Sequence, residues 1–371
     1  MTNLQNSGPA QLSRREAITR AAGAALGIAA ALTAGGELAS VSAQFPTVIP
    51  PAPDDRFPQV PSWKTELRQL APDVYAYQQR GGPGIYGLGI SNAGLIAGED
   101  HLMAIDALGA PLHTKAFIAA AKQATGGKPF GRLIDTHHHV DHVSGNQFFV
   151  PAEILSHPYC RQEVLKTVAT VPRMWEKREG FADGTEERKV VPPGTTFEDK
   201  ITYYYGDTVV EFRFVGPAHT WGDVIAYLPQ QKILFAGDIA FFYVAPFAHN
   251  AHVTKWLEAV DKVMAMDVET IVPGHGPVGG KKELAEMAEY FRLLKTEAKK
   301  RFDASMSAGQ AAADIRLGRF DNWIGPERIV INTVRLYDEF KGTLVPEVDV
   351  EGNRRAAEEY NAVKSAAAKH A

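Results

Sequence analysis

The chain has 371 residues, 45% of them hydrophobic, so it is long and apolar enough to bury a large core. Its formal net charge of −4 provides no basic surface of the kind that nucleic acids require, and we expect no nucleic-acid partner. Cys160 is the only cysteine, which excludes a disulfide within the chain.

The N-terminus resembles an export signal of the twin-arginine type. Arg14 and Arg15 precede an Ala- and Gly-rich stretch at residues 21–34, and small residues at 39–43 suit a cleavage site. We predict a signal peptide at residues 1–43, passage through the twin-arginine export machinery, and a periplasmic or secreted mature protein without a stable membrane anchor. A plain basic leader is the alternative. The proline-rich residues 44–64 predict an extended start to the mature chain.

Residues 65–280 alternate between predicted strands and helices, which indicates an α/β domain. Short apolar runs predict the strands, and apolar residues three and four positions apart predict the helices. In chain order, the expected strands cover residues 74–78, 90–97, 102–106, 132–135, 203–205, 209–215, 224–228, 232–236 and 270–272. The expected helices cover residues 113–124, 158–177 and 256–266. Glycines between positions 81 and 89 predict either a hairpin flap or an ordinary flexible turn.

Residues 281–371 differ in composition and predict a helical extension. The helical segments expected there are 281–302, 309–317, 326–340 and 354–369. The simplest role for these helices is to pack on the outer face of a sheet.

The segment at residues 136–142 contains four side chains that can bind a metal, namely His137, His139, Asp141 and His142. Side chains alternate along a strand, so His137 and His139 can point the same way and share one cation. Asp141 and His142 lie beyond the strand and are free to turn toward a second cation. Imidazole and carboxylate suit zinc or a similar divalent ion. A polar loop is the plain alternative.

Three later residues complete a set of metal-binding candidates. His219, Asp238 and His275 each follow a short apolar run and stand beside glycine or proline. This pattern is typical of a ligand on a loop at the end of a strand.

Together with the strand Leu102–Asp106, these motifs resemble those of the metallo-β-lactamase superfamily, in the same chain order over residues 65–280. The resemblance implies an αβ/βα four-layer sandwich with metals at the edge between two sheets. It also implies C-terminal helices that cover the site or form a homodimer. The first metal ion would be bound by His137, His139 and His219, and the second by Asp141, His142 and His275, with Asp238 bridging the two.

The resemblance implies a hydrolase acting on a small molecule. With two divalent ions, zinc first and manganese or iron as alternatives, a bridging hydroxide would attack the carbonyl of an ester, lactone or amide, β-lactams included. Asp141 and Asp238 would be the catalytic carboxylates. The alternatives on the same fold are a thioester hydrolase of the glyoxalase II type, a phosphodiesterase, and an iron-dependent redox enzyme resembling persulfide dioxygenases. Asp238 replaces the cysteine of certain β-lactamases, which favours a general hydrolase.

Several neighbours of the motifs are candidates for supporting roles. Asp106, and less so Asp135, could orient a ligand imidazole by accepting a hydrogen bond from it. His138 should face away from its neighbouring ligands, into packing. Asp223 either caps the next strand or braces the His219 loop.

Aromatic residues after the later motifs suggest the walls of a substrate pocket. No Lys or Arg follows Asp238 closely, so the sequence predicts a neutral or aromatic substrate. The residues expected at this wall are Trp221, Phe241, Phe242 and Tyr243, with His249 and His252 at the rim.

Overall fold

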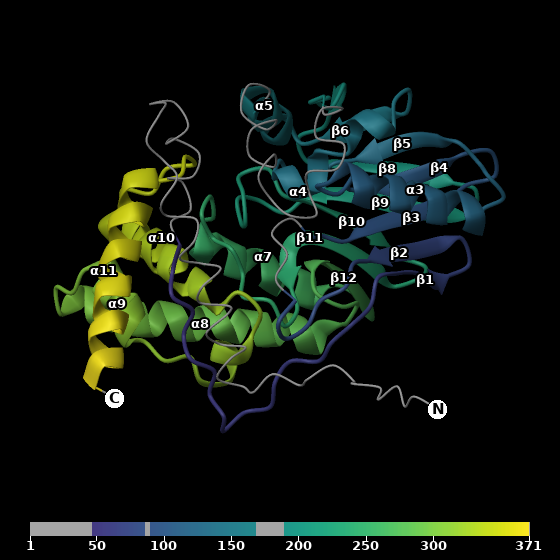
Figure 1. Ribbon diagram of the computed structural model, residues 1–371. Helices are drawn as coiled ribbons and strands as arrows, with labels where there is room; N and C mark the ends of the chain where they lie inside the picture. The colour runs from purple at the N-terminus through teal and green to yellow at the C-terminus, as the bar shows by residue number, and fades with distance from the viewer. Residues whose placement is uncertain (1–46, 86–89, 168–188, 371) are drawn as a thin grey trace, which may run out of the picture. The chain divides into compact units, whose positions relative to one another are not determined.

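The computed structural model describes residues 47–85, 90–167 and 189–370 (Figure 1). Four predicted features fall wholly or partly outside these ranges: the signal peptide at 1–43, residues 44–46 of the proline-rich start at 44–64, residues 86–89 of the glycine-rich segment at 81–89, and the predicted helix at 158–177 beyond Thr167. Within the described ranges, no helix has the length and apolar character needed to cross a membrane.

The first sheet places its strands in chain order. Antiparallel pairing joins β1 through β4, and parallel pairing joins β4 through β7. Helix α3 (Pro111–Ala124) provides the crossover that the parallel pair β4 and β5 requires. The strands are β1 (Glu66–Ala71), β2 (Val74–Gln78), β3 (Ala93–Ala97), β4 (Leu102–Ile105), β5 (Phe130–Ile134), β6 (Glu153–Ser156) and β7 (Thr195–Thr196).

The second sheet has the order β12-β11-β10-β9-β8. Its pairs are antiparallel except for β11 and β12, which are parallel and connected through α7 (Val253–Ala265). The strands are β8 (Lys200–Tyr205), β9 (Thr208–Phe214), β10 (Val224–Leu228), β11 (Ile233–Phe241) and β12 (Thr270–His275).

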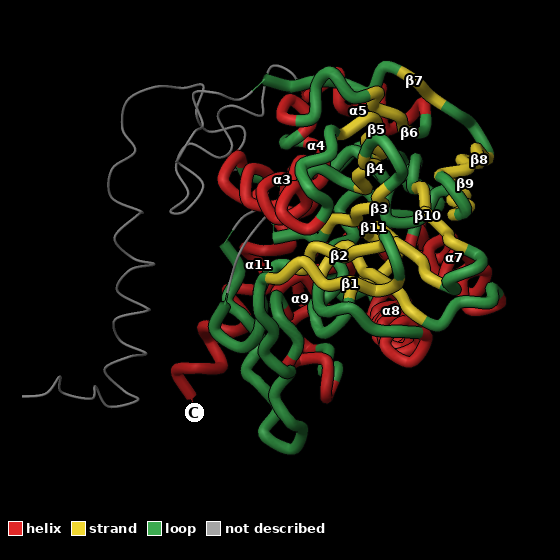
Figure 2. Tube along the Cα trace, turned by 90° about the vertical axis from the view of Figure 1, so that its right-hand side faces the viewer, coloured by secondary structure: helices red, strands yellow, loops and turns green. Residues whose placement is uncertain are grey.

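The two sheets pack face to face, with helices on both outer faces. Strand β4 shows why: Leu102 and Ala104 share a cluster with Phe117 of α3, whereas Met103 and Ile105 point into the layer between the sheets. Figure 2 shows α3 on one side of the strands and α7 and α8 on the other. The αβ/βα four-layer sandwich predicted from the sequence is therefore confirmed.

The C-terminal helices belong to the same compact unit as the sheets. Side chains of this extension, including Phe291, Tyr337 and Tyr360, are buried in one cluster with Phe241 of β11 and Trp256 of α7. The elements are α8 (Lys281–Asp303), α9 (Ala308–Asp314), η3 (Gly318–Asn322), η4 (Pro326–Arg328), α10 (Ile329–Lys341) and α11 (Val350–His370).

Two kinds of element depart from the sequence prediction. Strands β1, β6 and β7 were not predicted, because half of the residues of β1 are polar and the other two strands have four residues or fewer. Strand β11 was expected to end at residue 236, yet it continues to Phe241. Gly237, with φ of 49°, shifts the pairing register instead of ending the strand.

Candidate metal centre

The histidine-rich segment at residues 136–142 follows closely after β5. His137 lies two residues past Asp135, and His139 is the N-cap of the short helix α4 (Val140–Val143). Asp141 and His142 stand in the first turn of that helix. The change from extended chain to helix at His139 therefore turns the second half of the motif away from the first.

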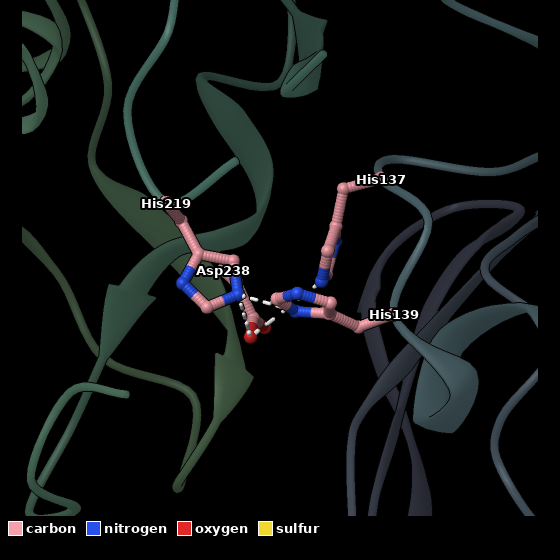
Figure 3. A group of neighbouring side chains, drawn as sticks. All are labelled: His137, His139, His219 and Asp238. Atoms are coloured by element: carbon pink, nitrogen blue, oxygen red, sulfur yellow. Dashed lines mark hydrogen bonds and ion pairs between the residues drawn. The ribbon is translucent and has the colours of Figure 1, made fainter. Parts of the chain in front are cut away.

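The later residues come from the other sheet. His219 lies in the loop between β9 and β10, Asp238 lies within β11, and His275 is the last residue of β12. Figure 3 shows His137 and His139 approaching from one side, and His219 and Asp238 from the other. The site thus lies at an edge where residues of both sheets meet.

All seven predicted ligands are brought together in two groups. Within each group the potential ligand atoms lie within 4.8 Å of one another. The first group is His137, His139, His219 and Asp238, and the second is Asp141, His142 and His275. His138 belongs to neither group: its ring contacts those of His139 and Tyr159, as expected for a side chain used in packing.

Asp238 connects the two groups. Its Oδ2 lies 3.0 Å from His219 Nε2 in the first group and 3.3 Å from His275 Nε2 in the second. Its Oδ1 lies 3.1 Å from His142 Nε2. One carboxylate is therefore shared between two sets of nitrogen donors.

The donor set fits a pair of divalent cations. Three buried atoms point into the cluster, namely His137 Nε2, His142 Nε2 and Asp238 Oδ1, and none of them makes a well-aligned hydrogen bond among the described residues. The 3.1 Å contact between His142 Nε2 and Asp238 Oδ1 is an ion-pair contact within the candidate ligand set itself. Buried polar atoms of this kind are costly unless something binds them. Nitrogen and carboxylate oxygen donors are those that zinc prefers.

Electrostatics within the cluster support the same conclusion. Burial lowers the pKa of His137 well below its usual value and that of His139 to about 3, so both rings are neutral at pH 7. Burial also opposes charge on His275, but Asp238 and Asp141 outweigh it and raise its pKa to about 9. In the absence of a metal ion, a proton on His275 thus balances the charge of Asp141 and Asp238. A bound cation could take the place of that proton.

Asp106 orients the imidazole of His142. Its Oδ2 lies 2.8 Å from His142 Nδ1, which leaves Nε2 facing the cluster. Asp106 also accepts hydrogen bonds of 2.8 Å from the Thr136 backbone N and from Thr136 Oγ1, which in turn lies 3.1 Å from His137 Nδ1. Asp106 has a φ of 62°, a costly backbone conformation that these contacts help to hold.

Two further ligand rings have a partner on the side away from the cluster. His275 Nδ1 lies 2.7 Å from the carbonyl oxygen of Ile90, and His139 Nε2 lies 3.1 Å from Asn250 Oδ1. Such contacts fix which ring nitrogen faces a metal. Nothing in the local sequence around Asn250 indicated this contact.

Asp223 and Asp135, the two other aspartates that the sequence singled out, have different roles. Asp223 accepts hydrogen bonds of 2.7 Å from the backbone N and the hydroxyl of Thr220, so it braces the His219 loop. Burial raises its pKa to about 6. Asp135 instead accepts a hydrogen bond of 2.7 Å from Asn146 Nδ2 and does not orient a ligand.

The predicted aromatic wall is wrong in its main members. Phe241 and Phe242 are each 1% exposed and belong to the main core cluster, so they pack in the core and do not form an open wall. Phe241 stacks on His275, with ring centroids 4.8 Å apart, and so supports a candidate ligand from behind. Burial and nearby Glu283 and Glu286 raise the pKa of Tyr243, which lies beside α8.

His249 and His252, which were predicted at the rim, and Trp221, which was predicted at the wall, make different contacts. His249 stacks on His139, with ring centroids 4.5 Å apart. His252 caps α7 by accepting a hydrogen bond from Lys255 N. Trp221 lies beside His252, with ring centroids 6.3 Å apart.

The C-terminal extension holds residues 244–252, which we call the rim loop. Arg328 donates to the carbonyl of Ala245 at 2.6 Å, and Arg335 donates to that of Ala251 at 2.5 Å. Asn332 of α10 contacts the loop twice, accepting from the Ala248 N and donating to the Pro246 carbonyl. The extension therefore positions a loop that contacts His139, besides packing on the sheet.

Gly274 leaves the space that Asp238 occupies. A Cβ atom at position 274 would lie 1.9 Å from Asp238 Oδ1. We expect Gly274→Ala to displace this carboxylate and weaken zinc binding by about tenfold to a hundredfold, measured by competition with a chromogenic chelator. Gly194→Ala is the matched control, because nothing lies within 4 Å of a Cβ there. Equal zinc affinity in the two variants would contradict the placement of Asp238.

Comparison with known proteins agrees with this geometry. Residues 86–275, just over half of the chain, match the family described as the Metallo-beta-lactamase superfamily. A linear primary-alkylsulfatase from Pseudomonas sp. is 24% identical over 44% of this chain and 38% of its own length. A 2,4-dinitroanisole O-demethylase subunit alpha from Nocardioides sp. is 23% identical over 48% of this chain and 51% of its own.

Two further relatives extend the comparison. A type 2 metallo-beta-lactamase from Bacteroides fragilis is 30% identical over 26% of this chain and 41% of its own. The solved structure of a stereoselective inverting sec-alkylsulfatase from Pseudomonas sp. superposes with a TM-score of 0.57, at 17% identity, over 75% of this chain and 50% of that one. The chain spans about half or less of the length of these relatives. The family match and the fold together show that this chain belongs to the metallo-β-lactamase superfamily.

Proposed function

We propose that the protein is a metal-dependent hydrolase that binds two divalent cations, zinc being the first choice, and cleaves an ester-type bond of a small molecule. The position of Asp238 is the observation that carries this proposal. Its carboxylate lies within 3.3 Å of nitrogen donors from both groups, and a site for one cation would not need such a shared ligand.

The chain's own residues would prepare the site for hydrolysis. Two bound divalent cations supply a water of lowered pKa and polarise the bond to be cleaved. The rings of His137 and His139 are held neutral and so are ready to bind a cation. The side chain of Asp141 is 16% exposed and that of Asp238 only 3%. Asp141 therefore lies on the solvent side, from which a substrate would approach.

The names of relatives in this family point to more than one type of bond, so we rank the candidate bonds. Our first choice is the carbonyl of an ester, lactone or amide. Hydrolysis of a sulfate ester is a second candidate, because an alkylsulfatase appears both among the sequence relatives and among the similar structures.

A chromogenic panel tests this proposal. Purified protein loaded with zinc or with manganese would be offered p-nitrophenyl esters, a lactone, a β-lactam, a thioester, a sulfate ester and bis(p-nitrophenyl) phosphate. We expect a carbonyl ester or the sulfate ester to turn over fastest, and turnover to disappear after treatment with a chelator. Faster hydrolysis of the phosphodiester than of every other substrate would move the protein to the phosphoesterases. In a separate metal analysis of protein made without added zinc, about one iron and no zinc per chain would favour a redox enzyme.

A further inference from the structure

Arg328 is connected to the candidate metal centre through two aromatic rings, although it is 90 residues away from Asp238 in the sequence. It ends the short helix η4, which follows Gly325 in a left-handed conformation with φ of 72°. Just before this turn, Ile324 pairs with Val244 at the start of the rim loop. Hydrogen bonds of 2.9 Å from Ala245 N to the Ile324 carbonyl and of 3.0 Å from Ile324 N to the Tyr243 carbonyl fix this pairing.

A row of rings leads from Arg328 to the candidate ligands. The guanidinium lies over the ring of Phe247, 5.3 Å from its centroid. The Phe247 ring lies 4.3 Å from that of His249, which stacks 4.5 Å from the ring of His139. The cation is thus held at the end of a rigid aromatic row that begins at a candidate ligand.

The charge of Arg328 is coupled to the carboxylates of the site. Burial lowers the pKa of its guanidinium, whereas Glu327, Asp141 and Asp238 raise it. Both Asp141 and Asp238 belong to the predicted ligand set. Two bound divalent cations would neutralise Asp141 and Asp238, so that of the three carboxylates only Glu327 would still balance the positive charge of Arg328.

Arg335, which is buried, and Arg328, which is half-buried, differ in their hydrogen bonds. Arg335 donates to three carbonyl oxygens, those of Ala251, Val345 and Glu347, and is therefore used in holding the chain. Arg328 donates to one carbonyl oxygen among the described residues, that of Ala245. A guanidinium carries five N–H donors, so Arg328 has donors to spare.

We propose that Arg328 binds an anionic oxygen group of the substrate, a sulfate or a carboxylate, next to the candidate metal centre. This inference rests on the proposed function and narrows its substrate class. A planar guanidinium pairs with such a group through two parallel hydrogen bonds. The sequence favoured a neutral substrate because no cation follows Asp238 closely, and the fold provides that cation from the C-terminal extension.

The test compares esters that differ in charge. Zinc-loaded protein would be assayed with p-nitrophenyl butyrate, mono(p-nitrophenyl) glutarate and p-nitrophenyl sulfate, which are neutral, carboxylate and sulfate probes. We expect Arg328→Met to lower the ratio of kcat/KM for an anionic ester over the neutral ester by about tenfold to a hundredfold. Arg328→Lys should lower it less, because lysine keeps the charge but not the paired donors. The anion that Arg328 binds is identified by the probe, glutarate or sulfate, whose kcat/KM falls further in Arg328→Met.

Arg355→Met is the matched control, since Arg355 lies in α11 of the same extension with its side chain 60% exposed. We expect it to leave the ratio unchanged. Equal losses on neutral and anionic esters in Arg328→Met would show that Arg328 only clamps the rim loop, and would overturn the inference. Binding of glutarate and octane-1-sulfonate, measured by calorimetry, separates the two proposals. The wild type could hydrolyse no ester at all. In that case, binding of either anion to the wild type but not to Arg328→Met would still support the anion site. Failure of the wild type to bind either anion would refute it.

Discussion

Replacing Asp238 with asparagine is expected to reduce the zinc content below two per chain and to lower kcat by about a thousandfold or more, equivalent to ~4 kcal/mol of transition-state stabilisation. Asparagine has nearly the same shape but carries no charge, and its amide nitrogen cannot bind a cation. Both groups of donors lose their shared ligand at once. His137→Ala should have a similar effect through the first group. Metal analysis and kinetics on the same preparations would measure both changes.

Folding and charge need separate controls in this experiment. Asp267→Asn removes an aspartate whose side chain is 73% exposed and should leave zinc content and turnover unchanged. Circular dichroism should show that Asp238→Asn and His137→Ala retain the wild-type secondary structure. Full turnover by His137→Ala on any substrate of the wild type would show that the proposed mechanism is wrong.

Ending the chain at residue 280 is expected to prevent formation of a soluble, metal-binding protein. Removal of α8 to α11 would uncover the cluster shared by Phe241 and Trp256, and an exposed apolar surface of this kind leads to aggregation. The rim loop would also lose its contacts with Arg328, Asn332 and Arg335. A soluble protein ending at residue 280 that binds two zinc ions and keeps wild-type activity would contradict this account. Expression, solubility and metal content provide the readouts.

Asn332→Ala tests the same contact in the full-length chain. Asn332 makes hydrogen bonds of 2.8 to 2.9 Å with Pro246 O, Ala248 N and Tyr290 Oη, all buried. Losing them should lower the free energy of unfolding by about 2–4 kcal/mol, measured by urea denaturation. Asn361→Ala is the control, since its hydrogen bonds to Thr47 and Ile49 are exposed. We expect that variant to lose less than about 1 kcal/mol.

The candidate ligands could be predicted because their signal is local. Each belongs to a residue type that binds metals and follows a short apolar run, and Asp238 is the one ligand whose strand continues past it instead of ending there. The four-layer fold followed from the family resemblance that the same motifs carried. The helix α4 after His139 also explains why Asp141 and His142 join the second group.

The surroundings of the site could not be predicted in the same way. The aromatic wall failed because β11 continues through Gly237, which carries Phe241 into the core instead of onto a loop. Asn250 contacts His139, and Arg328 contacts Phe247 of the rim loop, across large separations in the sequence, and no local pattern encodes such contacts. Sequence therefore indicated the chemistry of the centre more reliably than the identity of its walls.

The most direct test of the two-metal centre is anomalous X-ray diffraction at the zinc edge from crystals of the zinc-loaded protein. We expect two zinc peaks about 3.5–4 Å apart, one among His137, His139 and His219, the other among Asp141, His142 and His275. The carboxylate of Asp238 should lie between them. A single peak, or none, at saturating zinc would contradict the account.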